Sequence, residues 1–154
     1  MKAVHAGIIT ALCVNTIVAV AQEAPPSEQP ASEPYQPKIS DIMALQQERH
    51  FKLWFAGRAG NWPLADYEVD ALKDGFEALN GMLGGSTVED AVGNPIAALE
   101  KAIDAKDRAA FTSAFDRLTA GCNSCHHALD HGFISIRRPT LLPYGNQSFA
   151  VQKK

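Results

Sequence analysis

The sequence predicts an all-α protein built as an antiparallel four-helix bundle. Four stretches carry apolar side chains at intervals of three and four residues, the spacing that gives a helix one buried face. Moderate loops join these stretches, which favours helices that run back and forth beside one another. No succession of alternating strand patterns appears elsewhere in the chain.

The first 37 residues are expected to lie outside the bundle. Residues 1–21 combine a basic start, an uncharged apolar stretch and the small-x-small ending Ala19-Val20-Ala21, which are the three parts of an export signal. Residues 22–37 are rich in Pro, Glu, Ser and Gln and predict a disordered linker. We therefore expect a mature chain of 154 − 21 = 133 residues in the periplasm, without a membrane anchor.

The mature chain is expected to be a mildly acidic single domain. Loss of Lys2 with the signal changes the formal net charge from −3 to −4, and no basic run suggests nucleic-acid binding. Cleavage also removes Cys13, which leaves Cys122 and Cys125 as the remaining cysteines. Because these two lie three residues apart, they cannot staple distant parts of the fold, and their purpose must be local.

The first two helices have recognisable starts. Ser40 is expected to cap a helix over residues 40–57. Asn61-Trp62-Pro63 supplies a capping side chain and an early proline for a second helix that runs to about Asn80.

The glycines at 81, 84 and 85 then predict a flexible connection, and Asn94-Pro95 repeats the start signal for a short third helix ending near Asp104. Asp107 is expected to cap the last helix, whose apolar stripe includes both cysteines. The four-helix domain is thus expected over residues 38–131, and residues 132–154 are expected to form an extended tail.

The last helix carries the motif on which the functional interpretation depends. Residues 121–126 contain Cys122-x-x-Cys125-His126, the attachment signature of c-type haem. Two thiols on one side of a helix can bind the two vinyl groups of a porphyrin, while the adjacent histidine ligates the iron. Three alternatives are a zinc site completed by His127 and His131, a thioredoxin-like redox pair, and a chance surface disulfide.

A four-helix bundle with this motif in its last helix resembles the class II c-type cytochromes, the cytochrome c′ group. The resemblance covers about residues 38–131 and implies one covalent haem c. The stretches 49–57, RHFKLWFAG, and 61–67, NWPLADY, also look like a family of small exported haem proteins related to class II.

The sixth iron ligand is expected from the first helix. Met43, Gln46, His50, Trp54 and Gly57 follow one another at steps of three or four residues and share a stripe. The resemblance puts His50 where the family has its distal residue, and Gln46 where it usually has arginine. Three possibilities stay open: ligation by His50, ligation by Met43, or a His50 that is merely hydrogen-bonded.

Three residues are candidate haem contacts besides the ligands. Gln46 and Trp54 belong to the first-helix stripe, and Arg137 is expected to replace the missing arginine as a propionate partner, with Arg49 and Arg138 as alternatives.

The expected function is one-electron transfer between redox partner proteins, without enzymatic activity. The alternative is a cytochrome c′-like module that binds nitric oxide or carbon monoxide at an open iron face, and haem-based enzymatic chemistry ranks third. A homodimer is compatible with the resemblance. Four acidic residues are expected on the outer face of the second helix, as an ordinary solvated surface or, alternatively, as a patch that steers a basic partner: Glu68, Asp70, Asp74 and Glu77.

Overall fold

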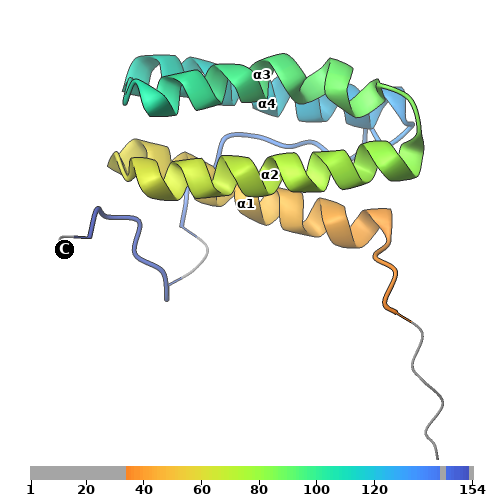
Figure 1. Cartoon of the computed structure of the whole chain (residues 1–154), viewed down its shortest axis with the longest axis horizontal. Helices are drawn as coiled ribbons and strands as arrows, with labels where there is room; N and C mark the ends of the chain where they lie inside the picture. The colour runs from red at the N-terminus through yellow and green to blue at the C-terminus, as the bar shows by residue number, and fades with distance from the viewer. Residues whose placement is uncertain (1–33, 143–144, 153–154) are drawn as a thin grey trace, which may run out of the picture. The chain divides into compact units, whose positions relative to one another are not determined.

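The computed structural model describes residues 34–142 and 145–152. It contains four helices in chain order: α1 (Ile39–Ala59), α2 (Trp62–Leu83), α3 (Thr87–Asp104) and α4 (Arg108–Ala128). They form an antiparallel four-helix bundle (Figure 1), which confirms the predicted fold class. The expected export signal and residues 22–33 of the expected linker lie outside the described residues.

The bundle consists of two helical hairpins. α1 packs along α2 and α3 along α4, and the two pairs are connected through the contact between α2 and α3. Figure 1 shows the hairpins as two layers, with α1 and α2 in one and α3 and α4 in the other. The direct contact between α1 and α4 is much smaller, so the bundle is less tightly closed along that side.

Two predicted caps hold the ends of the helices. The Asn61 side chain accepts a hydrogen bond from the Leu64 amide at the start of α2. The Asp107 carboxylate accepts hydrogen bonds from the amides of Ala109 and Ala110, at 2.9 and 3.0 Å, at the start of α4. These bonds satisfy amides that lack partners within the helix, and they confirm both predicted starts.

The third helix begins earlier than predicted. α3 starts at Thr87, so Pro95 lies inside it and Asn94-Pro95 is not a start signal. The apolar face extends backward from Ile96 to Val92 and Val88, both of which are 3% exposed. Burial of these two side chains outweighs the cost of an internal proline, and the glycine-containing connection shrinks to residues 84–86.

The end of the bundle where α1 meets the start of α4 is packed with aromatic rings. The Trp54 and Phe115 ring centroids are 5.0 Å apart, and Phe111 contacts both Trp54 and Trp62. At Gly57 the Phe111 ring occupies the space that a Cβ would take. α1 and α4 therefore approach closely at this end, because a glycine removes the obstacle between them.

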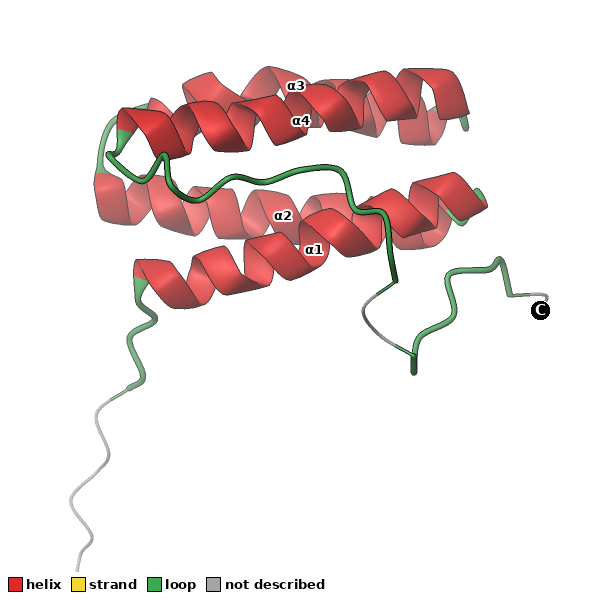
Figure 2. Cartoon of the chain, turned by 180° about the vertical axis from the view of Figure 1, so that it is seen from behind, coloured by secondary structure: helices red, strands yellow, loops and turns green. Residues whose placement is uncertain are grey.

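After α4 the chain returns along the bundle as a strap, which we define as residues 131–142. Figure 2 shows this loop crossing the side of the bundle on which α1 and α4 lie. No helix or strand is assigned to the described residues after α4. Farther along, Phe149 is buried and packs against Phe55, which fastens the described end of the tail to α1.

None of the helices within residues 34–142 is long and apolar enough to cross a membrane.

Candidate functional site

A cavity of about 670 Å³ occupies the end of the bundle away from the aromatic cluster. This volume falls in the range of pockets that enclose a small molecule or cofactor. All four helices and the strap contribute to its walls, which are mostly apolar. The lining includes Met43, Gln46 and His50 from α1, Cys122, Cys125 and His126 from α4, and Ile134 and Ile136 from the strap.

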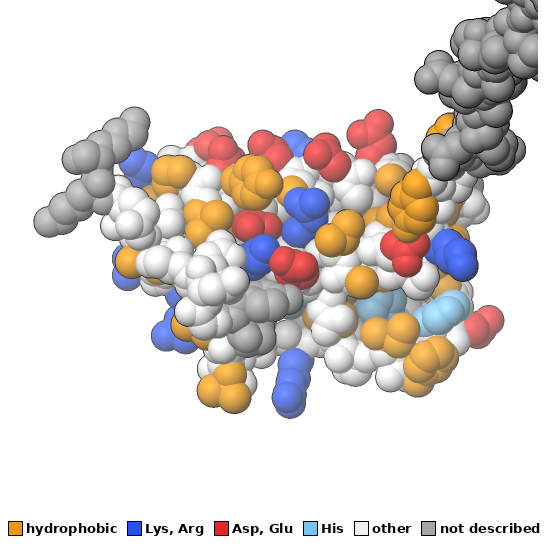
Figure 3. All heavy atoms as spheres, turned by 90° about the horizontal axis from the view of Figure 1, so that it is seen from below, with side chains coloured by type: hydrophobic (Ala, Val, Ile, Leu, Met, Phe, Trp, Pro, Cys, Tyr) orange, Lys and Arg blue, Asp and Glu red, His pale blue; other side chains and the backbone are white. Residues whose placement is uncertain are grey.

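The strap also forms an apolar edge beside this cavity. Phe133 is 81% exposed and Ile134 is 41% exposed. The ring centroids of Phe133 and His131 lie 5.7 Å apart. Figure 3 likewise shows histidine side chains beside apolar side chains at one end of the molecule.

His126 is buried, and its imidazole is held by the strap. Its Nδ1 lies 2.9 Å from the carbonyl oxygen of Ile134. A carbonyl only accepts hydrogen bonds, so Nδ1 must carry the proton and donate it. In the neutral ring the lone pair is then on Nε2, which is the usual arrangement of a histidine that binds a metal.

The two cysteines line the same cavity as His126 and are not joined in a disulfide. Loss of contact with water raises the pKa of the Cys122 thiol to about 12, and burial also raises the pKa of Cys125. Both side chains are therefore neutral thiols at neutral pH.

The zinc alternative lacks a set of ligands among the described residues. Among the residues that the structure describes, no three His, Cys, Asp or Glu side chains gather to hold a metal ion. His127 and His131 are both exposed, and the Nδ1 of His131 is hydrogen-bonded to the carbonyl of Leu129.

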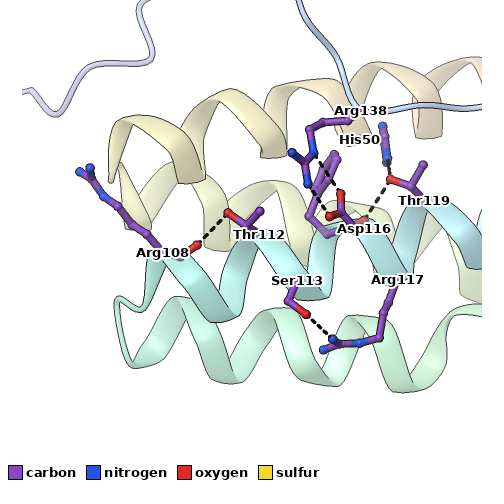
Figure 4. A network of polar contacts seen from close by, with 9 residues as sticks. His50, Arg108, Thr112, Ser113, Asp116, Arg117, Thr119 and Arg138 are labelled. Carbon is purple, nitrogen blue, oxygen red and sulfur yellow. Dashed lines mark hydrogen bonds and ion pairs between the residues drawn. The ribbon is translucent and has the colours of Figure 1, made fainter.

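His50 is buried on α1 and is hydrogen-bonded across the bundle to α4. Its Nε2 lies 2.8 Å from Thr119 Oγ1 (Figure 4). The Thr119 hydroxyl donates its own proton to the carbonyl of Phe115, so its oxygen accepts from His50. Nε2 therefore carries the proton. Burial lowers the pKa of His50 to about 4, so the ring is neutral at physiological pH.

The contact between His50 and Thr119 also indicates which α1 residue lies at the level of His126. α1 and α4 run antiparallel, so seven residues back from His50 and seven forward from Thr119 lie at the same level of the bundle. These positions are Met43 and His126. His50 lies about 10 Å farther along the axis, at a rise of 1.5 Å per residue. Met43 is thus level with His126, and both line the cavity.

Gln46 lines the cavity but is largely committed to the contact between α1 and α2. Its side-chain amide donates a hydrogen bond of 2.8 Å to the carbonyl of Leu72. Its Oε1 is buried without a hydrogen-bond partner and lies against Gly75, where a Cβ would collide with it. The glycine therefore makes room for the buried amide.

Two of the sequence-predicted contacts, Trp54 and Arg137, are not among the residues that line the cavity. Trp54 belongs to the aromatic cluster, and Arg137 is exposed. The neighbouring Arg138 forms an ion pair with Asp116 (Figure 4), and its guanidinium lies 4.6 Å from the centroid of the Trp54 ring. Arg138 thereby fastens the strap to both α4 and α1.

The prediction for Glu68 is wrong. It is 3% exposed, whereas Asp70, Asp74 and Glu77 are exposed as predicted. Burial raises the pKa of the Glu68 carboxyl, and the nearby cations Lys52 and Arg49 lower it by less. The sequence pattern placed Glu68 on the outer face of α2. In the structure, the buried face of α2 is wide enough to include Glu68.

Sequence reasoning missed the residues that hold the two histidines. The carbonyl of Ile134 binds His126, and Thr119 binds His50. Asn123, a spacer of the Cys-x-x-Cys-His motif, exchanges two hydrogen bonds with the backbone of Ile136. No sequence motif predicts these partners. Any residue can supply a backbone carbonyl, and the contacts of Thr119 and Asn123 join residues that are not neighbours in the sequence.

The fold and this cavity define a four-helix all-α protein with two thiols and a histidine on one wall of a large apolar pocket. No family model, curated protein or solved structure matches the chain.

Proposed function

We propose that this chain is a mono-haem c-type cytochrome that carries one electron between redox partner proteins in the periplasm. One observation carries the proposal: His126, which directly follows the second thiol, lines the same cavity as both thiols and keeps its Nε2 lone pair. The size and apolar walls of that cavity also fit a porphyrin.

Different residues of the cavity would attach the porphyrin and ligate the iron. Cys122 and Cys125 would bind it covalently through thioether bonds, and His126 would ligate the iron through Nε2. The iron supplies the one-electron chemistry when the haem is bound. The apolar helix faces and the strap exclude water, which together with ligand identity sets the reduction potential.

We propose Met43 rather than His50 as the sixth ligand. Met43 is the thioether level with His126, whereas the Nε2 of His50 is about two helical turns away and donates its proton to Thr119. A histidine–methionine pair gives a higher potential than two histidines and leaves no open iron face, which suits an electron carrier. The apolar edge at Phe133 and Ile134 would be the place where partner proteins dock.

The alternative function is binding of nitric oxide or carbon monoxide. The observation in its favour is the bond between His50 and Thr119, which keeps that imidazole away from an iron held by His126. If Met43 does not bind, the sixth position stays open.

Visible absorption spectra of the purified ferric and ferrous protein test these assignments. We expect a sharp ferrous α band that carbon monoxide leaves unchanged, and haem that stays with the chain in acidified acetone. In Met43→Leu the spectrum should become high-spin and sensitive to carbon monoxide. His50→Gln is the matched control, because it removes the other candidate ligand from the same helix and should keep the low-spin spectrum.

Three other results would change the conclusion. A wild-type spectrum that shifts with carbon monoxide would favour the gas-binding alternative. A low-spin spectrum lost in His50→Gln but kept in Met43→Leu would make His50 the ligand. Purified protein without covalently bound haem would overturn the cytochrome proposal itself.

A further inference from the structure

Asn123 uses its whole side-chain amide to bind the strap. Its Nδ2 donates a hydrogen bond of 2.9 Å to the carbonyl of Ile136, and the Ile136 amide donates one of 2.7 Å to Asn123 Oδ1. The side chain thus replaces a neighbouring β-strand for this residue, because it satisfies both backbone groups. Asn123 lies between the two cysteines, so the clamp is part of the haem-attachment motif itself.

The clamp is one of a series of contacts between the strap and α4. Ile134 binds His126, Ile136 binds Asn123, and Arg138 pairs with Asp116. Alternate strap residues therefore meet α4 in antiparallel order, as an extended chain requires.

The carbonyl that binds His126 is held from both sides. Before it, the Ile134 amide donates a hydrogen bond of 2.9 Å to the carbonyl of His131. After it, the Asn123 clamp fixes Ile136, two residues farther along. The position of the Ile134 carbonyl, and with it the orientation of the His126 ring, depends on both anchors.

From this geometry we infer that Asn123 is a positioning residue, which holds the strap so that the Ile134 carbonyl stays on His126 Nδ1 and lowers the reduction potential of the haem. This inference rests on the proposed function. Donation from Nδ1 makes Nε2 a more basic ligand, which favours ferric iron. Loosening the clamp weakens that donation and shifts the potential upward.

The test uses the holoprotein and three variants. Asn123→Ala removes both clamp bonds, and Asn123→Asp keeps the acceptor for the Ile136 amide but loses the donor. Ser135→Ala is the matched control, because Ser135 is an exposed strap residue between Ile134 and Ile136. The measurements are hydrogen exchange of the Ile136 amide and the reduction potential, recorded after the wild-type absorption spectrum has established bound haem.

We expect Ile136 to exchange about fivefold faster in Asn123→Ala, the equivalent of one lost hydrogen bond, together with a higher potential. Asn123→Asp should keep slow exchange, and Ser135→Ala should match the wild type in both measurements. If Asn123→Ala does not accumulate, the clamp is tested with the other proteins. The Ile136 amide should then exchange slowly both in the wild type and in Asn123→Asp, because both side chains offer it an acceptor oxygen.

Either of two results would overturn the inference alone. In one, Ile136 exchanges at the wild-type rate in Asn123→Ala, so the clamp does not hold the strap. In the other, exchange accelerates but the potential of Asn123→Ala equals that of the wild type, so the strap does not act on His126. Absence of haem from the wild-type protein is a different result and would overturn the proposed function together with this extension of it.

Discussion

Acid should destabilise this protein through His50 by an amount that can be worked out from its burial. Burial lowers the pKa of His50 from 6.5 to about 4. Between pH 6.5 and 4, His50 is therefore protonated in the unfolded chain but neutral in the folded chain. The free energy of unfolding consequently decreases as the pH falls through this range. A difference of 6.5 − 4 = 2.5 pKa units corresponds to about 3 kcal/mol at 1.36 kcal/mol per unit.

His50→Gln isolates this contribution, because glutamine can donate to Thr119 but does not titrate in this range. We would measure the free energy of unfolding of both holoproteins in urea at pH 7.5 and at pH 4. The wild type should lose about 3 kcal/mol more than the variant between these two values. Thr119→Ser, which keeps the hydroxyl partner, should behave like the wild type.

Equal losses in the wild type and in His50→Gln would refute the reasoning. Such a result would mean that His50 accepts a proton without leaving its buried position, and that the hydrogen bond assigned to its neutral ring is not what holds it. A direct check is the NMR titration of the His50 ring protons, whose midpoint should fall near pH 4.

Three further predictions concern the stability of the bundle. Gly57→Ala should cost about 1–3 kcal/mol and lower the melting temperature, because the new methyl group collides with the Phe111 ring; an unchanged melting temperature would contradict the close approach of α1 and α4. Asp107→Ala should cost about 1 kcal/mol in urea unfolding, because it removes the cap of α4, and Asp107→Asn should restore most of that loss. Burial raises the pKa of Glu68, so its ionisation opposes folding as the pH rises; Glu68→Gln should therefore be more stable than the wild type at pH 7, and that advantage should vanish below pH ~4. An advantage that persists in acid would assign the gain to packing instead.

The helices were largely predictable from sequence because their signals are local. Asn61 and Asp107 cap the helices that they were predicted to cap, since a capping side chain binds amides only two or three residues away. Asn94-Pro95 has the same local character, yet α3 continues through it. There the burial of Val88 and Val92 against the other helices decides, and a local pattern does not contain that information.

The candidate site was predictable in part for the same reason. The motif from Cys122 to His126 puts two thiols and an imidazole on neighbouring turns of one helix, so their proximity follows from the sequence. The first-helix stripe gave Met43 and His50 as candidate iron ligands without choosing between them, and both line the cavity. That choice depends on the register of α1 against α4, which joins residues more than sixty positions apart.

By itself, the sequence determined the four-helix class, two of the helix starts and the Cys-x-x-Cys-His motif, because each depends on residues a few positions apart. Only the tertiary structure decided which ring nitrogen of each histidine is hydrogen-bonded. Ile134 binds His126 Nδ1, and Thr119 binds His50 Nε2. These partners come from another segment of the chain, and packing of the helices and the strap brings them within hydrogen-bonding distance.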